Sequence, residues 1–204
     1  MKLTLVLALL FGLAGTAIAQ TYGPSLYDVA NVASDDVLYI RSAPDADSPS
    51  LGSLRPDARG LEVTGQSADG KWARVNSGEA AGWVALRFLR LSAAWADGTP
   101  FGLACSGTEP FWSIRAVPGY LEYADANGET RRYREHERLR GAGVGFADLA
   151  IIGQADGQSA SMIISPASCN DGMSGREYAL RIQLLRPGAQ MPLLSGCCSM
   201  IAAQ

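Results

Sequence analysis

The sequence predicts a mainly β protein, in which a small barrel is followed by a second, disulfide-stapled antiparallel β domain. Three observations indicate this fold class. Short runs of β-forming residues recur at regular spacing, clusters of Gly, Pro, Asp and Ser separate them, and all four cysteines lie after residue 104. Evenly spaced short strands with turn residues between them are typical of small β domains. An even number of cysteines in an exported chain indicates disulfides.

The first 19 residues have the features of a secretory signal peptide. Lys2 precedes an apolar run from Leu5 to Ile18, and the small residues Ala17 and Ala19 form a cleavage pattern at its end. The run is shorter than the roughly 20 apolar residues that a membrane-spanning helix needs, and it ends in a cleavage pattern. We therefore expect cleavage after Ala19, a periplasmic or secreted product, and no stable insertion into the membrane.

Residues 27–91 are predicted to form the first β domain. Along one strand Trp72 and Arg74 share a face, while Ala73 and Val75 share the other, as expected for a period of two. The six strands predicted here are Tyr27–Val32, Val37–Arg41, Leu51–Leu54, Leu61–Thr64, Trp72–Val75 and Gly82–Ala85. Turn residues between them favour a small barrel or sandwich.

The same region resembles the bacterial SH3-like domains. The resemblance rests on VLYIRSAP at 37–44, LGSL at 51–54, LEV at 61–63, KWARV at 71–75 and GWV at 82–84. Tyr39 and Ala43 depart from the usual Asn and Gly of that family. The resemblance implies a small barrel that serves as a targeting or binding module for the cell envelope, including peptidoglycan.

Residues 92–100 read as a short linker, and residues 101–204 as a second, mostly antiparallel β domain. Asn127-Gly128 is a strong hairpin signal within it. A short helix over 134–140 is an alternative for the charged segment there. The strands predicted in this domain are Phe111–Val117, Tyr120–Tyr123, Thr130–Tyr133, Ala160–Ser165, Tyr178–Leu185 and Leu193–Met200.

Two motifs mark the second domain, CSGTEPFW at 105–112 and CNDGMSGREY at 169–178, and GCC follows at 196–198. Together they resemble an uncharacterised family of secreted and lipoprotein envelope proteins with GTEPFW, CxDGMSxxxY and GC motifs. The resemblance covers about residues 101–200. Gly175 departs from it, because an acidic residue is common at that position. This family implies no secure activity.

The four cysteines allow three disulfide connectivities, and the one that joins Cys197 to Cys198 is disfavoured because adjacent residues suit disulfide geometry poorly. If the last segment is a strand, these two cysteines point to opposite faces and reach different elements. The residues alone leave two pairings open. The resemblance to family members with a single bridge implies Cys169–Cys197, which leaves Cys105–Cys198.

Catalytic and metal-binding interpretations are weaker than structural ones. His136, the one histidine of the chain, lies in a charged segment that we expect to be solvated, so a Cys–His mechanism is not favoured. Glu109 and Asp171 could form a carboxylate pair for acid–base work, yet both lie in predicted loops. Export favours disulfides over a zinc site. We therefore expect no enzyme activity, no metal and no cofactor.

The sequence thus favours an exported binding or scaffolding protein whose partner is peptidoglycan or an envelope protein. A formal net charge of −3 gives no support to nucleic-acid binding. Inhibition or sensing of a lysozyme or other cell-wall hydrolase by the second domain is an alternative, and a carboxylate-dependent hydrolase is a second. Packing in the barrel core or over its open edge is the competing interpretation for Trp72 and Trp83. The candidate ligand-binding residues are Tyr39, Trp72, Trp83, Glu109, Trp112 and Asp171.

Overall fold

A computed structural model describes residues 23–95, 101–142 and 148–202. Within these ranges the chain forms sixteen strands and one short 3-10 helix, which confirms the predicted fold class. The proposed signal peptide at 1–19 lies outside the described residues. No helix in the described part is long and apolar enough to cross a membrane.

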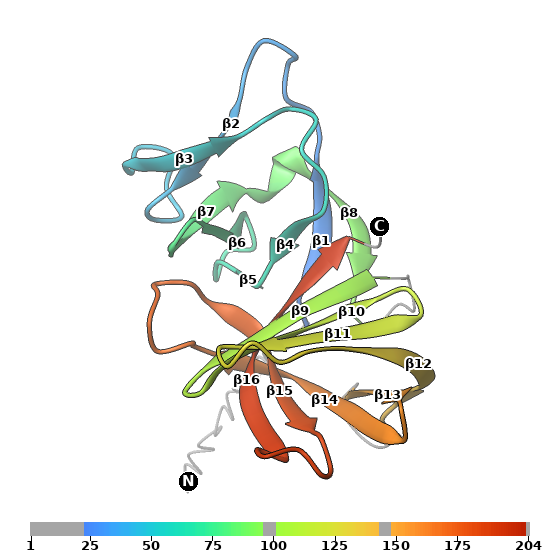
Figure 1. Cartoon of the computed structure of the whole chain (residues 1–204). Coiled ribbons are helices and arrows are strands. Elements are labelled where there is room, and N and C mark those ends of the chain that lie inside the picture. Colours follow the sequence, from blue (N-terminus) through green and yellow to red (C-terminus); the bar gives the residue numbers. More distant parts are fainter. Residues whose placement is uncertain (1–22, 96–100, 143–147, 203–204) are drawn as a thin grey trace, which may run out of the picture.

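The N-terminal unit, residues 23–95, is built from two small sheets that enclose one core (Figure 1). One sheet has the order β4-β1-β8 and the other β3-β2-β7-β6-β5. The core side chains are small and mostly branched: Val29, Leu38, Ile40, Val63, Ala73, Val75 and Val84. The elements are β1 (Ser25–Val29), β2 (Leu38–Arg41), β3 (Ser50–Leu54), β4 (Leu61–Val63), β5 (Gly65–Gln66), β6 (Trp72–Ser77), β7 (Ala80–Ala85), η1 (Leu86–Phe88) and β8 (Leu89–Ala94).

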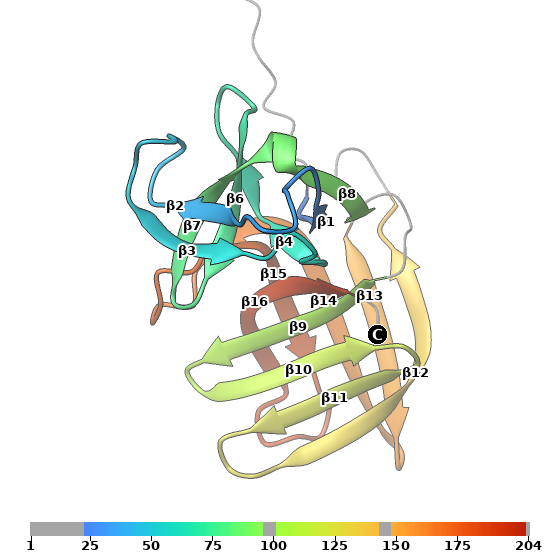
Figure 2. The same ribbon diagram turned by 90° about the horizontal axis from the view of Figure 1, so that it is seen from above.

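The C-terminal barrel, residues 101–202, is a closed barrel of eight antiparallel strands. Figure 2 shows β9 to β12 on the near side and β13 to β16 behind them. Alternate residues point inward, and the inward side chains fill the interior as expected for a barrel of this size. The strands are β9 (Phe101–Thr108), β10 (Phe111–Val117), β11 (Tyr120–Asp125), β12 (Thr130–Arg140), β13 (Leu149–Ala155), β14 (Gln158–Cys169), β15 (Tyr178–Leu185) and β16 (Leu193–Ala202).

The alternative of a helix over 134–140 is wrong, because these residues belong to β12. That strand pairs with β11 on one side and β13 on the other, and a bulge near Glu135 and Glu137 lets it curve. Pairing on both edges outweighs the weak helical preference of a charged segment. The proposed linker at 92–100 begins inside β8, and residues 96–100 lie outside the described residues.

Two disulfides reinforce the C-terminal barrel on opposite faces of one strand. Cys198 faces inward and is joined to Cys105, its direct neighbour on β9. Cys197 is joined to Cys169, where β14 ends and the loop 170–177 begins. These are the pairs that the family resemblance implies. The inner bridge closes the barrel between β9 and β16, and the other fixes the loop.

The two units share a packed seam. Leu26 and Ala93 of the N-terminal unit belong to the same apolar cluster as Phe101 of the barrel, and Trp95 stacks against Phe101 at 5.4 Å between ring centroids. Strand β16 extends upward to lie beside β1 (Figure 1). The relative position of the two units is therefore set by side-chain packing as well as by the connecting chain.

Candidate functional site

The outer face of the five-stranded sheet in the N-terminal unit carries a row of alternating aromatic and arginine side chains on β2, β7 and β6. We call it the aromatic–arginine row, and its members are Tyr39, Arg41, Trp83 and Arg74. The Arg41 guanidinium lies 5.1 Å from the centre of the Tyr39 ring, and that of Arg74 lies 4.7 Å from the Trp83 ring. Arg41 and Arg74 are the strand partners of Trp83 on its two sides. Tyr39 is 48% exposed. The row therefore combines aromatic rings with positively charged groups.

The structure places Trp72 and Trp83 outside the core of the N-terminal unit. Both are only partly buried, and they point away from the side of the sheet that carries Ala73, Val75 and Val84. The alternation in β6 places Trp72 on the face of Arg74, and Trp83 is the strand partner of Arg74. Small residues fill this core, so the tryptophans cover the outer side of the sheet.

Asp171 organises the loop 170–177 rather than offering a free carboxylate. One of its carboxylate oxygens accepts hydrogen bonds from the backbone N–H groups of Met173 and Ser174, at 3.0 and 2.9 Å. The other accepts from the Ser174 hydroxyl at 2.8 Å and from the Tyr178 hydroxyl at 3.3 Å. The donated backbone hydrogen bonds lower the pKa of Asp171 to about 2. Such a carboxylate is a weak base, which disfavours the hydrolase alternative.

The far side of the same loop docks on the β6–β7 hairpin. Gly175 forms a parallel β-bridge with Ala80, in which its N–H donates to the Glu79 carbonyl at 2.8 Å and its carbonyl accepts from the Ala81 N–H at 3.0 Å. A Cβ at position 175 would lie 3.2 Å from the Glu79 oxygen. Glycine at this position thus permits the close approach of the two backbones.

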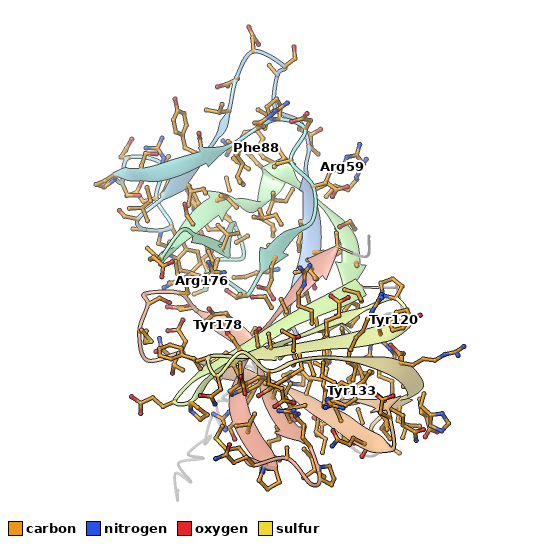
Figure 3. The ribbon with its side chains drawn as sticks, viewed as in Figure 1. Arg59, Phe88, Tyr120, Tyr133, Arg176 and Tyr178 are labelled. Carbon is orange, nitrogen blue, oxygen red and sulfur yellow. A yellow bond between two sulfur atoms is a disulfide. The ribbon has the colours of Figure 1, made fainter. Side chains whose placement is uncertain are left out.

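Arg176 and Glu177 extend this contact. The Arg176 guanidinium donates to the Gly78 carbonyl at 2.9 Å, and Figure 3 shows this side chain at the seam between the two units. The Glu177 carboxylate forms an ion pair with Arg74, and its backbone exchanges two hydrogen bonds with the Asn76 side chain. The CNDGMSGREY motif therefore connects the barrel to one end of the aromatic–arginine row.

Trp112 is not available to a ligand, because only 4% of it is exposed. Its indole ring packs inside the barrel under two glycines of the motifs. A Cβ at Gly107 would lie 2.3 Å from the indole nitrogen, and a Cβ at Gly196 would lie 2.0 Å from the Ser106 carbonyl oxygen. The GTEPFW and GC motifs thus describe one packing arrangement.

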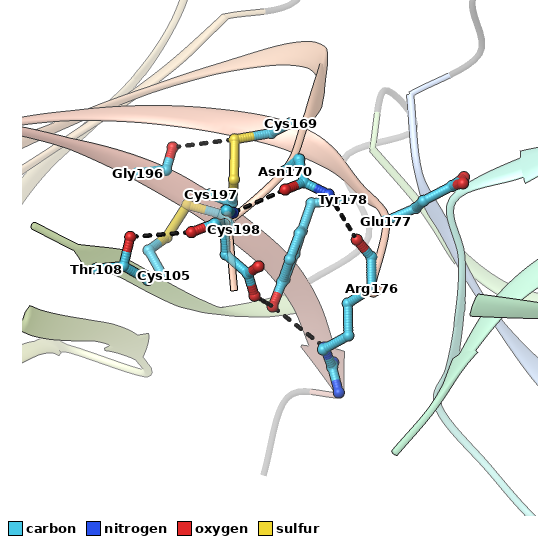
Figure 4. Close-up of a disulfide and its surroundings, with 12 residues drawn as sticks. Cys105, Thr108, Cys169, Asn170, Arg176, Glu177, Tyr178, Gly196, Cys197 and Cys198 are labelled. Atoms are coloured by element: carbon cyan, nitrogen blue, oxygen red, sulfur yellow. Dashed lines mark hydrogen bonds between the residues drawn. A yellow bond between two sulfur atoms is a disulfide. The ribbon is translucent and has the colours of Figure 1, made fainter. Parts of the chain in front are cut away.

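Glu109 and Asp171 are brought to one hollow of about 600 Å³ on the outer face of the barrel. The β9–β10 turn, the start of the loop 170–177 and strands β15 and β16 line it. The Thr108 hydroxyl donates to the Asp171 carbonyl at 2.9 Å and thereby joins two of these walls. Figure 4 shows the two disulfides beside this loop.

Glu62 is a functional candidate that sequence reasoning missed. It extends from β4 across the seam and accepts a hydrogen bond of 2.7 Å from the Met200 N–H on β16. Burial of the carboxyl raises its pKa to about 7, although the Met200 N–H and the Arg176 charge oppose that shift. The residues in contact are 138 positions apart in the sequence, so no local pattern indicates the contact.

The remaining chemical candidates do not assemble into a site. His136 is exposed on β12. Among the residues that the structure describes, no group of three or more His, Cys, Asp or Glu side chains is arranged to hold a metal ion.

Comparison with known proteins bears on the first half of the chain. Residues 36–90 match the family model of the bacterial SH3 domain. No curated protein and no solved structure matches the chain. The matched segment contains β2 to β7, and hence Tyr39, Arg41, Arg74 and Trp83. The chain therefore carries a bacterial SH3 domain at residues 36–90, and the aromatic–arginine row lies on its outer face.

Proposed function

We propose that this protein is exported and binds the cell envelope through its bacterial SH3 domain, with peptidoglycan as the ligand. The family match supports a binding role for the domain. The single structural observation that carries the proposal is the aromatic–arginine row, which ends in the exposed Tyr39. The two disulfides are compatible with a location outside the cytoplasm.

The chemistry of the row suits a wall polymer made of sugars and short peptides. Aromatic rings provide a large, rigid apolar surface with polar edges, on which the apolar face of a sugar can stack. Arginine presents a planar fork of N–H donors that matches a peptide carboxylate. Tyr39 and Arg41 offer these two functions side by side, and Trp83 and Arg74 repeat the same arrangement of a ring beside a guanidinium group.

The C-terminal barrel supports one end of the row. Glu177 pairs with Arg74, and Arg74 lies over Trp83, so this end of the row is held in place before a ligand arrives. The Tyr39 end has no such contact with the barrel among the described residues. We therefore place the main ligand contacts at Tyr39 and Arg41, because Tyr39 is the exposed end of the row and Arg74 is already paired with Glu177.

The proposal is tested by sedimentation with purified peptidoglycan sacculi, using the chain that begins at Gln20. We expect the Tyr39→Ala and Arg41→Gln variants to bind about tenfold more weakly, as is usual when a central aromatic or arginine contact is removed. Tyr120→Ala is the matched control, because Tyr120 is also exposed and stacked against an arginine, Arg132, but lies on the barrel.

Three outcomes are distinguishable. Weaker sedimentation of the Tyr39 and Arg41 variants alone supports the proposal. Sedimentation that disappears after the sacculi have been treated with protease identifies a wall-associated protein as the partner instead of peptidoglycan. Equal sedimentation of all variants contradicts a role for the aromatic–arginine row.

One observation favours the alternative of hydrolase inhibition by the C-terminal barrel. Met173 is 68% exposed and lies in a loop that Asp171 and the Cys169–Cys197 disulfide hold rigid. Rigid loops with an exposed apolar side chain lose little entropy on binding. A fall in lysozyme activity on titration with the protein, reversed by Met173→Ala, would support this function.

A further inference from the structure

The hollow that contains Glu109 has walls that are fixed by several independent contacts. The Cys169–Cys197 disulfide joins the start of the loop 170–177 to β16. Asp171 then fixes the turn of the loop by accepting the Met173 and Ser174 N–H groups. On its far side the loop is anchored to the β6–β7 hairpin by the Gly175 bridge. A hollow held this firmly is organised before any ligand binds.

Three charged residues line this hollow, and the Asp171 carboxylate among them is already taken up by hydrogen bonds within its own loop. The other two, Glu109 and Arg181, have opposite charges and form no ion pair with each other. Glu109 lies in the β9–β10 turn, and Arg181 lies on the outer face of β15. Both are exposed, and within the described chain neither side chain takes part in an ion pair or a hydrogen bond. The wall between them carries Ser106 and Ser195, whose hydroxyl groups can donate or accept.

We propose that this hollow is a second binding site, which takes a short peptide that has both a free ammonium group and a free carboxylate. Arg181 binds the carboxylate through its forked N–H groups, and Glu109 binds the ammonium group. The serine hydroxyls and the exposed backbone of the loop 170–177 face the peptide amides. A volume of about 600 Å³ lies within the range of sites for small ligands.

This site is separate from the aromatic–arginine row, because it lies on the C-terminal barrel and uses none of the residues of the SH3 domain. The inference therefore holds whether or not the SH3 domain binds peptidoglycan.

The test is a titration of the isotope-labelled chain with three probes, followed by NMR. The probes are Ala-Ala-Ala, its N-acetylated form, which lacks the ammonium group, and its C-terminal amide, which lacks the carboxylate. We expect Ala-Ala-Ala to shift the backbone signals of Gly107, Gly172 and Gly196, which line the hollow. Each blocked probe should bind at least about tenfold more weakly, since it loses one charge-assisted contact.

Two variants assign the ends of the peptide. Arg181→Gln should bind Ala-Ala-Ala and its amide equally, because the contact to the carboxylate is already lost. Glu109→Gln should bind Ala-Ala-Ala and its acetylated form equally for the corresponding reason at the ammonium end. Arg115→Gln and Glu137→Gln are matched controls, because these residues are also exposed and without an ion pair in the described chain, and neither lines the hollow.

The inference is overturned if Ala-Ala-Ala causes no shifts at these glycines, if the three probes bind equally, or if both variants keep the wild-type preference for charged ends. Sedimentation of Arg181→Gln with sacculi separates the two proposals. Normal sedimentation together with lost peptide binding is the result expected when both proposals hold. Absent peptide binding to the wild-type protein, with normal sedimentation, would remove this inference alone.

Discussion

The two units of this protein reach a stable β fold in different ways. The N-terminal unit closes two small sheets over seven buried residues and has no cysteine. The C-terminal barrel closes eight strands over a much larger apolar cluster, and two disulfides tie β9 and β14 to β16. At the seam, Leu26, Ala93 and Trp95 of the smaller unit join the core of the larger one. The N-terminal unit thus packs against a barrel that two disulfides reinforce.

The largest effect on this comparison should come from removal of the inner disulfide. A chain that carries Cys105→Ala and Cys198→Ala should lose about 4.5 kcal/mol of unfolding free energy, because the bridge spans 93 residues and restricts the unfolded chain. The corresponding change at Cys169 and Cys197, which spans 28 residues, should cost about 3.5 kcal/mol.

Urea unfolding followed by near-ultraviolet circular dichroism measures both losses. Equal stability of the two double variants and the wild-type protein would show that the barrel does not need its bridges.

The second-largest effect should be a change of the free energy of unfolding with pH, caused by Glu62 at the seam. The pKa of Glu62 is raised to about 7 in the folded protein, above its ordinary value of 4.5, so the folded state binds more protons between these values. The contribution of Glu62 to the free energy of unfolding is therefore fully present below about pH 4.5. It is lost as the pH rises through about 7, which lowers the free energy of unfolding by about 3 kcal/mol.

Glu62→Gln keeps an acceptor for the Met200 N–H and removes the ionisation, so its stability should not fall over this range. Unfolding measured at pH 5, 6, 7 and 8 on both chains checks this. A wild-type protein that is as stable at pH 8 as at pH 5 would contradict the buried position of this carboxyl.

A smaller effect should follow from filling the space beside Trp112. Gly107→Ala places a Cβ 2.3 Å from the indole nitrogen, so the ring or the strand must move, at a cost of about 2 kcal/mol. Gly65→Ala is the matched control in the N-terminal unit, since its Cβ would meet the nearest atom at 3.9 Å. Thermal unfolding of the two variants should show a lower melting temperature for Gly107→Ala alone, and equal melting temperatures would contradict the packing described.

The smallest effect concerns the loop 170–177. The pKa of Asp171 is lowered to about 2 from its usual 3.8, so its stabilising contribution is present above about pH 4 and is lost as the pH falls toward 2. Solvent screens this partly exposed carboxylate, and Asp171→Asn should cost about 1 kcal/mol at neutral pH. Unfolding at pH 7 and pH 3 measures the difference, which should be smaller at the lower pH; a difference that grows on acidification would contradict the role of the carboxylate.

The sequence predicted local features well where alternation or turn residues were clear. It placed Ala73 and Val75 on one face of β6 and Trp72 and Arg74 on the other, which the structure confirms. Alternation alone does not show which face is buried. Because tryptophan has more apolar surface than alanine, the face of Trp72 is as good a candidate for the core as the face of Ala73. Arg74 lies on the same face as Trp72, and this charged residue indicates that the face is the exposed one.

Features that depend on distant contacts could not be predicted from local patterns. The sequence predicts no strand at the positions of β9 and β13, and it leaves β12 open to a helical interpretation. The strand character of these segments comes from pairing with their neighbours in the barrel. The sequence motifs do not indicate which contacts their residues make. Asp171 and Gly175 hold and dock a loop, and this becomes visible only when β6 and β7 lie beside it.

The central claim is that envelope binding resides in the N-terminal unit and that the reinforced barrel is its platform. Sedimentation with sacculi, measured with the disulfides intact and after mild reduction, tests this claim most directly. We predict that the reduced protein is still retained and that retention still depends on Tyr39, because the SH3 domain contains no disulfide. Retention that is lost on reduction and insensitive to Tyr39→Ala would place the binding site on the barrel and contradict the claim.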